Sequence, residues 1–131
     1  MQPMPTNNRR ALLVEDEVLV AMVATDALGE LGFDVVEATS AKSALTLAEA
    51  DIDNFALAIV DLGLPDRPGE ELVAELKAMR ANLPIIVASG QSADGNARFE
   101  TFTSLVILSK PYEFKSLRAS IEALGLCPPA T

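Results

Sequence analysis

The chain has 131 residues, half of them hydrophobic, which is the length and composition of one domain with its own hydrophobic core. Its 19 acidic and 10 basic residues give a net charge of −9, which disfavours both nucleic acid and an anionic membrane surface as partners. The absence of histidine excludes Ser-His-Asp and Cys-His catalysis and the ordinary kinds of zinc site.

The two ends of the chain have the composition of tails. We predict flexible tails at residues 1–8 and 127–131 and a single domain over residues 9–126. The N-terminal stretch MQPMPTNNRR precedes an apolar run, but the acidic EDE that follows would interrupt the core of a signal peptide. The one cysteine, Cys127, has no partner for an internal disulfide, so we expect a reducing, cytoplasmic compartment.

Five short apolar runs are predicted to be strands. They are rich in Leu, Val, Ile and Ala, they are bounded by polar or turn residues, and they mostly lack strict alternation. Strands of a parallel sheet that are buried on both faces have this pattern. In chain order, the runs are residues 11–14, 34–38, 56–60, 84–89 and 105–108.

Apolar residues at helical spacing lie between these runs. The stripes are Val20, Val23, Ala24, Ala27, Leu28 and Leu31, closed by Gly32; Ala44, Leu47 and Ala48, capped by Ser40; Leu72, Val73, Leu76, Met79 and Leu83, ended before Pro84; and Phe114, Leu117, Ile121 and Leu124. A further helix at about residues 96–103 is weakly indicated. This alternation predicts an α/β fold, a doubly wound parallel sheet of five strands with helices on both faces.

Polar residues stand at the carboxyl ends of four predicted strands, where ligands bind in such folds. Glu15 and Asp16 follow the first strand, Asp61 the third, Ser89 the fourth and Lys110 the fifth. Each one alone is ordinary turn or cap chemistry. If these strands are neighbours, three carboxylates, a hydroxyl and an ammonium group converge at one edge of the sheet.

Such a cluster is electrostatically unfavourable by itself. Two carboxylates about 4–5 Å apart repel by roughly 3–4 kcal/mol at an effective dielectric constant near 20. Three of them require a divalent cation and a nearby ammonium group to remain ionised together. Hard oxygen ligands suit Mg²⁺, and beside a nucleophilic carboxylate this set is suited to phosphoryl transfer.

Four stretches, in this order, resemble the receiver domain of two-component response regulators over roughly residues 9–126. They are LLVEDE, AIVDLGLPD followed by PGEEL, PIIVASG and LSKPYEF. The resemblance implies a three-layer, flavodoxin-like fold with strand order 2-1-3-4-5. It also implies that Asp61 takes a phosphoryl group from a sensor histidine kinase or a histidine phosphotransfer protein, and that the chain signals through protein contacts with a downstream target. The chain would then catalyse only its own phosphorylation and dephosphorylation.

The resemblance also implies a role for each site residue. Mg²⁺ (or Mn²⁺) would be held by Glu15, largely through water, by Asp16, by Asp61 and by the backbone carbonyl of Gly63. Lys110 would pair with Asp61 and then with the phosphoryl group, and Ser89 would move to hydrogen-bond it.

Three positions bear on how the signal is timed and transmitted. Ile107 stands where family members commonly have an aromatic residue that swings inward on activation. Gly63 and Gln91 stand two residues past Asp61 and Ser89, and they resemble the positions that tune the phosphoryl lifetime in this family. Because Gly63 has no side chain to shield the group and Gln91 could orient a water, we hypothesise a short-lived phosphoryl state.

Alternative functions remain open. One is a phosphorylation-independent adaptor of the same fold, and another is a receiver fragment of a larger regulator or hybrid kinase; the end at GLCPPAT leads us to expect a stand-alone receiver. A dehalogenase-type phosphatase is disfavoured because it needs a second Asp at the position of Gly63, and a flavodoxin because the chain lacks its phosphate loop and flanking aromatics. Val18, Leu19 and Met22 add apolar positions to the first helix, either as scattered surface residues or as a docking patch for a kinase or phosphotransfer helix bundle.

Overall fold

The computed structural model describes residues 10–89, 104–109 and 113–125. Five parallel strands form one sheet in the order β2-β1-β3-β4-β5. The strands are β1 (Arg10–Val14), β2 (Asp34–Ala38), β3 (Phe55–Asp61), β4 (Ile85–Ser89) and β5 (Leu105–Ser109). The helices are α1 (Val18–Glu30), α2 (Ala41–Asp51), the short 3₁₀ helix η1 (Ile52–Asn54), α3 (Gly69–Met79) and α4 (Phe114–Ala123). The predicted doubly wound fold and its strand order are confirmed; the weakly indicated helix at 96–103 lies outside the described residues.

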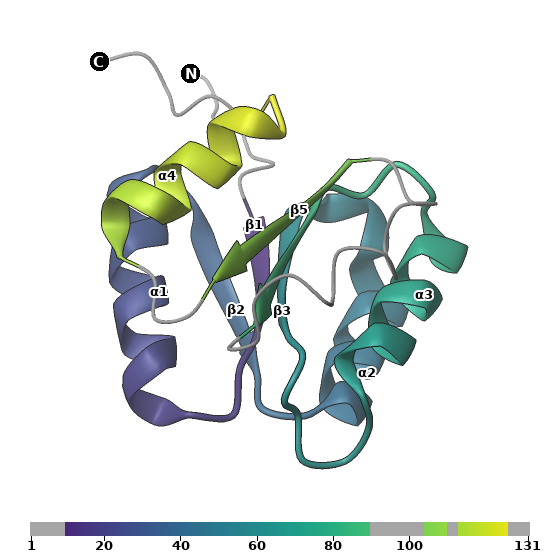
Figure 1. Cartoon of the computed structure of the whole chain (residues 1–131). Helices are drawn as coiled ribbons and strands as arrows, with labels where there is room; N and C mark the ends of the chain where they lie inside the picture. Colours follow the sequence, from purple (N-terminus) through teal and green to yellow (C-terminus); the bar gives the residue numbers. More distant parts are fainter. Residues whose placement is uncertain (1–9, 90–103, 110–112, 126–131) are drawn as a thin grey trace, which may run out of the picture.

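Helices cover both faces of the sheet, which gives the three predicted layers. Figure 1 shows α1 and α4 on one side of the sheet and α2 and α3 on the other. Each face has its own apolar cluster: Ala24, Leu28, Leu117 and Ile121 pack on one, and Ala44, Ala48, Leu72 and Leu76 on the other. Of the helices in the described parts of the chain, none has the length and apolar character needed to cross a membrane.

The third strand, β3, lies at the centre of this arrangement. It pairs with β1 on one side and with β4 on the other. Six of its seven residues are buried, and one of these is Asp61, the last residue of the strand. A strand held on both edges and both faces has little freedom to move, so it fixes the backbone of Asp61.

Two details of the helices differ from the sequence prediction. Val23 was expected in the core stripe of α1, but its side chain is 50% exposed. The buried residues of α1 are Ala21, Ala24, Ala27 and Leu28, and at about 100° per residue Val23 lies roughly 110° from the centre of this face. The expectation that Val23 belongs to the core was therefore wrong.

The stripe of α3 was expected to continue to Leu83, but the helix ends at Met79. Arg80 has an extended backbone, and its guanidinium donates hydrogen bonds to the carbonyl oxygens of Ile52 and Phe55, at 3.2 and 2.7 Å. Leu83 is still buried, as its apolar character indicated, but it reaches the core from the loop before β4. Because Pro84 follows it, Leu83 is disfavoured in a helical conformation.

Candidate functional site

The register of the sheet places two carboxylates side by side. Val14 at the end of β1 pairs with Val60 of β3, so the next residues, Glu15 and Asp61, leave the sheet at the same level. The backbone N–H of Glu15 donates to the carbonyl oxygen of Ala38 at 3.0 Å, which continues the ladder one residue past β1. Both carboxylates therefore stand on ordered backbone at the carboxyl ends of the strands.

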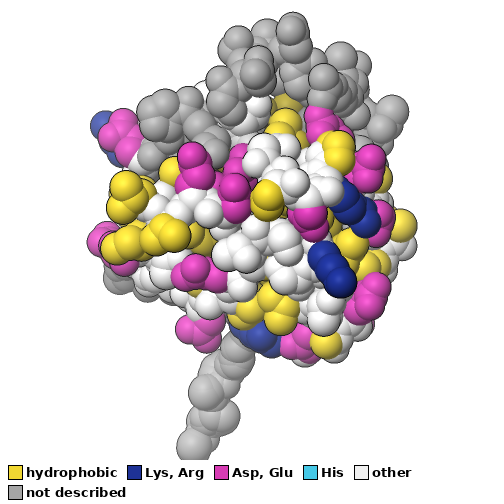
Figure 2. Space-filling view, turned by 90° about the horizontal axis from the view of Figure 1, so that it is seen from below, with side chains coloured by type: hydrophobic (Ala, Val, Ile, Leu, Met, Phe, Trp, Pro, Cys, Tyr) yellow, Lys and Arg dark blue, Asp and Glu magenta, His cyan; other side chains and the backbone are white. Residues whose placement is uncertain are grey.

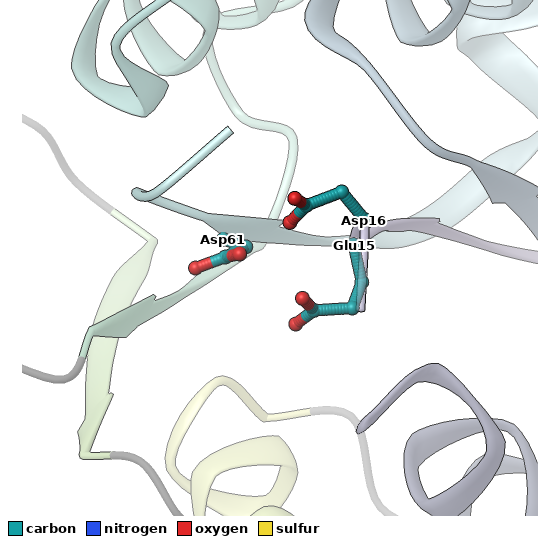
Figure 3. Close-up of side chains that lie close together, drawn as sticks. All are labelled: Glu15, Asp16 and Asp61. Carbon is teal, nitrogen blue, oxygen red and sulfur yellow. The ribbon is translucent and has the colours of Figure 1, made fainter. Parts of the chain in front are cut away.

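Glu15, Asp16 and Asp61 form one acidic cluster, in which a carboxylate oxygen from each lies within 4.8 Å of the others. Figure 3 shows the side chains of Glu15 and Asp16 extending from the chain after β1 toward the side where Asp61 lies. Glu15 and Asp61 are only 3% and 4% exposed, whereas Asp16 is exposed. The sequence predicted this proximity; the roles of the three residues remain predictions.

Backbone N–H groups orient two of these carboxylates. The N–H of Gly63 donates to Oδ1 of Asp61 at 3.1 Å, and the N–H of Glu17 donates to Oε2 of Glu15 at 3.2 Å. Hydrogen bonds of this kind hold the carboxylate in one orientation. The chain segments that follow β1 and β3 thus fold back onto the acidic side chains.

The cluster fits a small divalent cation. At an effective dielectric constant near 20, two charges no more than 4.8 Å apart, as the carboxylate oxygens of this cluster are, repel by about 3.5 kcal/mol or more. A divalent cation between them would reverse this cost. The donors are all hard oxygens, one of them on an exposed residue, which suits Mg²⁺ because this ion keeps part of its water shell.

The remaining predicted site residues are only partly covered by the described structure. Ser89 ends β4, is 5% exposed, and follows Ala88, which pairs with Asp61. Ile107 is half-buried in β5 against the apolar cluster beneath α2 and α3. Lys110 and Gln91 lie outside the described residues, so their predicted places at the site stay predictions.

Two contacts that the sequence did not reveal lie in the loop after β3 and at the start of α3. A Cβ atom at Gly69 would lie 2.6 Å from the Cα of Leu62 and 2.8 Å from the carbonyl oxygen of Asp61. The carboxylate of Asp66 accepts hydrogen bonds from the backbone of α2. A Gly at the start of a helix and an Asp after a Pro are ordinary residues at such places, and their distant partners leave no local signal in the sequence.

An exposed apolar surface lies beside the cluster. Four large hydrophobic side chains on the first turns of α1, here called the α1 patch, are Val18, Leu19, Met22 and Val23, with exposures of 71, 76, 57 and 50%. Figure 2 views the end of the molecule that carries the site and shows hydrophobic side chains grouped on the side where α1 lies. The helix begins three residues after Glu15, so the patch adjoins the acidic cluster.

Comparisons with a family model, with curated relatives and with solved structures all point to one protein family. The sequence profile of the response regulator receiver domain matches residues 11–122. The sensor kinase CckA of Brucella abortus is 31% identical over 114 residues, which are 86% of this chain. The transcriptional regulatory protein PdtaR of Mycobacterium tuberculosis is 30% identical over 115 residues, or 87% of this chain. A CheY-like receiver domain from Methanospirillum hungatei is 28% identical, with a TM-score of 0.78 over 89% of this chain and 94% of that one.

The chain is shorter than these curated relatives. Its matched region spans 12% of the Brucella kinase and 55% of the mycobacterial regulator. The likeness therefore concerns one domain of each.

Proposed function

This chain belongs to the response regulator receiver domain family, and from this we propose that Asp61 accepts a phosphoryl group from the phosphohistidine of a sensor histidine kinase or a histidine phosphotransfer protein. The observation that carries the proposal is the acidic cluster of Glu15, Asp16 and Asp61, with oxygens within 4.8 Å of one another. Asp61 is its member on the central strand, where the backbone is held on both sides.

The transfer is a displacement at phosphorus. A carboxylate oxygen of Asp61 attacks the phosphorus atom, the P–N bond breaks, and its electron pair stays on the imidazole nitrogen. Attack by water on the resulting acyl phosphate returns Asp61 and inorganic phosphate. The reaction is thus confined to the protein's own phosphorylation and dephosphorylation.

The other residues hold the groups that react. Glu15, Asp16, Asp61 and the carbonyl of Gly63 would hold Mg²⁺ (or Mn²⁺). When bound, this ion would neutralise charge on the carboxylates and on the phosphoryl oxygens. Ser89 and Lys110 would bind the transferred group. In this proposal the protein acts in the cytoplasm and passes the signal to a downstream protein by contact.

Intact mass tests the acceptor directly. We would incubate the protein with Mg²⁺ and a small acyl or amido phosphate donor, and compare wild type with Asp61→Asn. Wild type should gain one phosphoryl group and Asp61→Asn none, because the amide lacks the nucleophilic carboxylate. Asp26→Asn, an exposed carboxylate on α1, is the matched control and should be phosphorylated as wild type is.

Two outcomes would contradict the proposal. A phosphoryl group on Asp61→Asn would place the acceptor elsewhere. No adduct on wild type would favour the phosphorylation-independent adaptor, which keeps the fold and uses the same surfaces for binding.

For the partner, we propose that the α1 patch docks on the helix of the kinase or phosphotransfer protein that carries the phosphohistidine. The patch adjoins the acidic cluster, so a helix lying on it would bring its histidine toward Asp61. Its four side chains are at least half exposed, and apolar surface grouped at one place is typical of an interaction site.

Charged substitutions separate docking from chemistry. Leu19→Glu and Leu19→Lys should each slow phosphotransfer from the protein donor about tenfold or more, a loss of about 1.4 kcal/mol. Phosphorylation by the small donor should be unchanged, as should the urea midpoint, because Leu19 is already in water. The acidic cluster would repel the Glu and attract the Lys, so slower transfer in both variants cannot be due to repulsion by the cluster. Transfer at the wild-type rate in both variants would show that these are scattered surface residues.

A further inference from the structure

Asp66 connects the loop after β3 to a helix that lies 24 residues earlier in the chain. Its Oδ1 accepts the backbone N–H of Ala41, and its Oδ2 accepts that of Lys42, both at 3.0 Å. Ala41 and Lys42 are the first two residues of α2. One carboxylate therefore bridges the segment that follows Asp61 and the N-terminus of α2.

The N-terminus of α2 is well suited to receive this carboxylate. The first N–H groups of a helix have no acceptor within the helix, and their partial charges favour an anion. The hydroxyl of Ser40 accepts the N–H of Ser43 at 3.1 Å, so Asp66 supplies the acceptors for the two N–H groups that Ser40 does not reach. These two hydrogen bonds lower the pKa of the Asp66 carboxyl below its ordinary value of 3.8, and the bond from Ala41 has the larger effect.

The two ends of the loop are held at the end of β3. The N–H of Gly63 donates to Asp61, and the N–H of Gly69 donates to the carbonyl oxygen of Leu62 at 3.3 Å. Pro65, whose ring restricts its backbone, directly precedes Asp66. The bridge from Asp66 to α2 thus joins the middle of the loop to a different element of the fold.

We propose that Asp66 is a positioning residue for the metal site: by holding the loop on α2, it keeps the backbone carbonyl of Gly63, three residues earlier, at the acidic cluster. The inference rests on the proposed metal role of Gly63. Asp66 itself does not touch the metal or the phosphoryl group. Removing it leaves every proposed ligand in place but lets the segment that carries one of them move.

The expected effect is a loss of metal affinity with little loss of maximal rate. Residues that orient metal ligands typically change affinity by about 10- to 100-fold, and for this exposed bridge we expect the lower end, about tenfold, in Asp66→Ala. The affinity is measured by calorimetric titration of the unphosphorylated protein with MgCl₂. At saturating Mg²⁺, phosphorylation by the small donor should approach the wild-type rate.

Ser40→Ala is the matched control. It removes the other cap of α2 but leaves the bridge from Asp66, so it loosens the same helix without releasing the loop. Its Mg²⁺ affinity should equal that of wild type. Asp66→Asn keeps one acceptor oxygen and should fall between Asp66→Ala and wild type. Faster amide hydrogen exchange at Ala41 and Lys42 in Asp66→Ala would show directly that the bridge is lost.

The outcomes distinguish this inference from the proposed function. Wild-type Mg²⁺ affinity in Asp66→Ala would overturn the inference alone, and so would an equal loss in Ser40→Ala, which would point to fraying of α2. If wild type does not bind Mg²⁺, the proposed metal site fails, and the positioning role fails with it.

Discussion

Gly63 lies beside the carboxylate to which we assign the chemistry. A Cβ atom added there would meet the two carboxylate oxygens of Asp61 at 3.8 and 4.0 Å, which is ordinary van der Waals contact. A side chain at this position therefore fits without moving the backbone and would stand directly over the acceptor. As it is, Gly63 offers no side chain to cover Asp61.

The substitution Gly63→Asn should lengthen the life of the phosphorylated form. We expect slower hydrolysis by about threefold or more, which corresponds to roughly 0.7 kcal/mol in the barrier, because the amide would obstruct the approach of water. The decay of the adduct is followed by intact mass after the donor is removed. Gly63→Ala should show a smaller effect. Equal decay in all three proteins would contradict the proposed influence of Gly63 on lifetime.

Among the helices, α3 starts in close contact with the backbone at Asp61 and Leu62. Gly69, its first residue, lies so close to the chain at Leu62 that a Cβ would come within 2.6 Å of Cα. Backbone atoms cannot rotate away as a side chain can, so any larger residue would displace either α3 or the end of β3. The absence of a side chain at Gly69 lets the helix approach the site.

We therefore expect Gly69→Ala to lower the free energy of unfolding by about 1–3 kcal/mol, as overpacking commonly does. It should also slow phosphorylation by the small donor, since the displaced backbone carries Asp61. Urea unfolding measures the first effect and intact mass the second. The control is Gly29→Ala in α1, where a Cβ would meet nothing within 4 Å, and where Ala should stabilise the helix by about 0.4–1 kcal/mol. Similar results for the two variants would refute the steric argument.

At the scale of the whole molecule, the negative charge of the chain and the acidic cluster both oppose the compact state. The net charge is −9, and the cluster concentrates three carboxylates at one end of the sheet. A cation that binds the folded protein and not the unfolded chain must stabilise the fold by mass action. The stability of the fold is thus linked to the occupancy of the site.

Mg²⁺ should accordingly raise the stability by about 2.7 kcal/mol at a concentration one hundred times its dissociation constant. NaCl at the same ionic strength is the control for general screening. In Asp61→Asn the stabilisation by Mg²⁺ should be smaller, while the stability without Mg²⁺ should be higher, because a repelling carboxylate is gone. The measurement is urea unfolding with and without each salt. Equal effects of the two salts would argue against a specific site.

Most of the fold was predictable because each element has a local pattern. The five apolar runs became the five strands, with ends shifted by at most one residue. The errors arose where tertiary contacts decide: α3 stops at Met79, where Arg80 turns to the carbonyl oxygens of Ile52 and Phe55. The spacing of the apolar residues gives no sign that Arg80 leaves the helix to bind these two carbonyl groups.

The same division holds for the candidate site. Glu15, Asp16 and Asp61 could be expected to meet, because the carboxyl ends of adjacent parallel strands share one edge. Asp66 could not be assigned, since its acceptor role depends on where α2 begins in space. A carboxylate in a turn has the same local sequence whether it binds water or a helix N-terminus.

The missing side chain at Gly63 has a consequence for the kind of information that the molecule carries. Under our hypothesis of a short-lived phosphoryl state, the phosphorylated fraction of the protein falls soon after the kinase stops transferring phosphoryl groups. The level of phosphorylation then reports the present activity of the kinase and keeps little memory of its past activity. A downstream target would read a signal that resets quickly, which suits a response that must follow changing conditions.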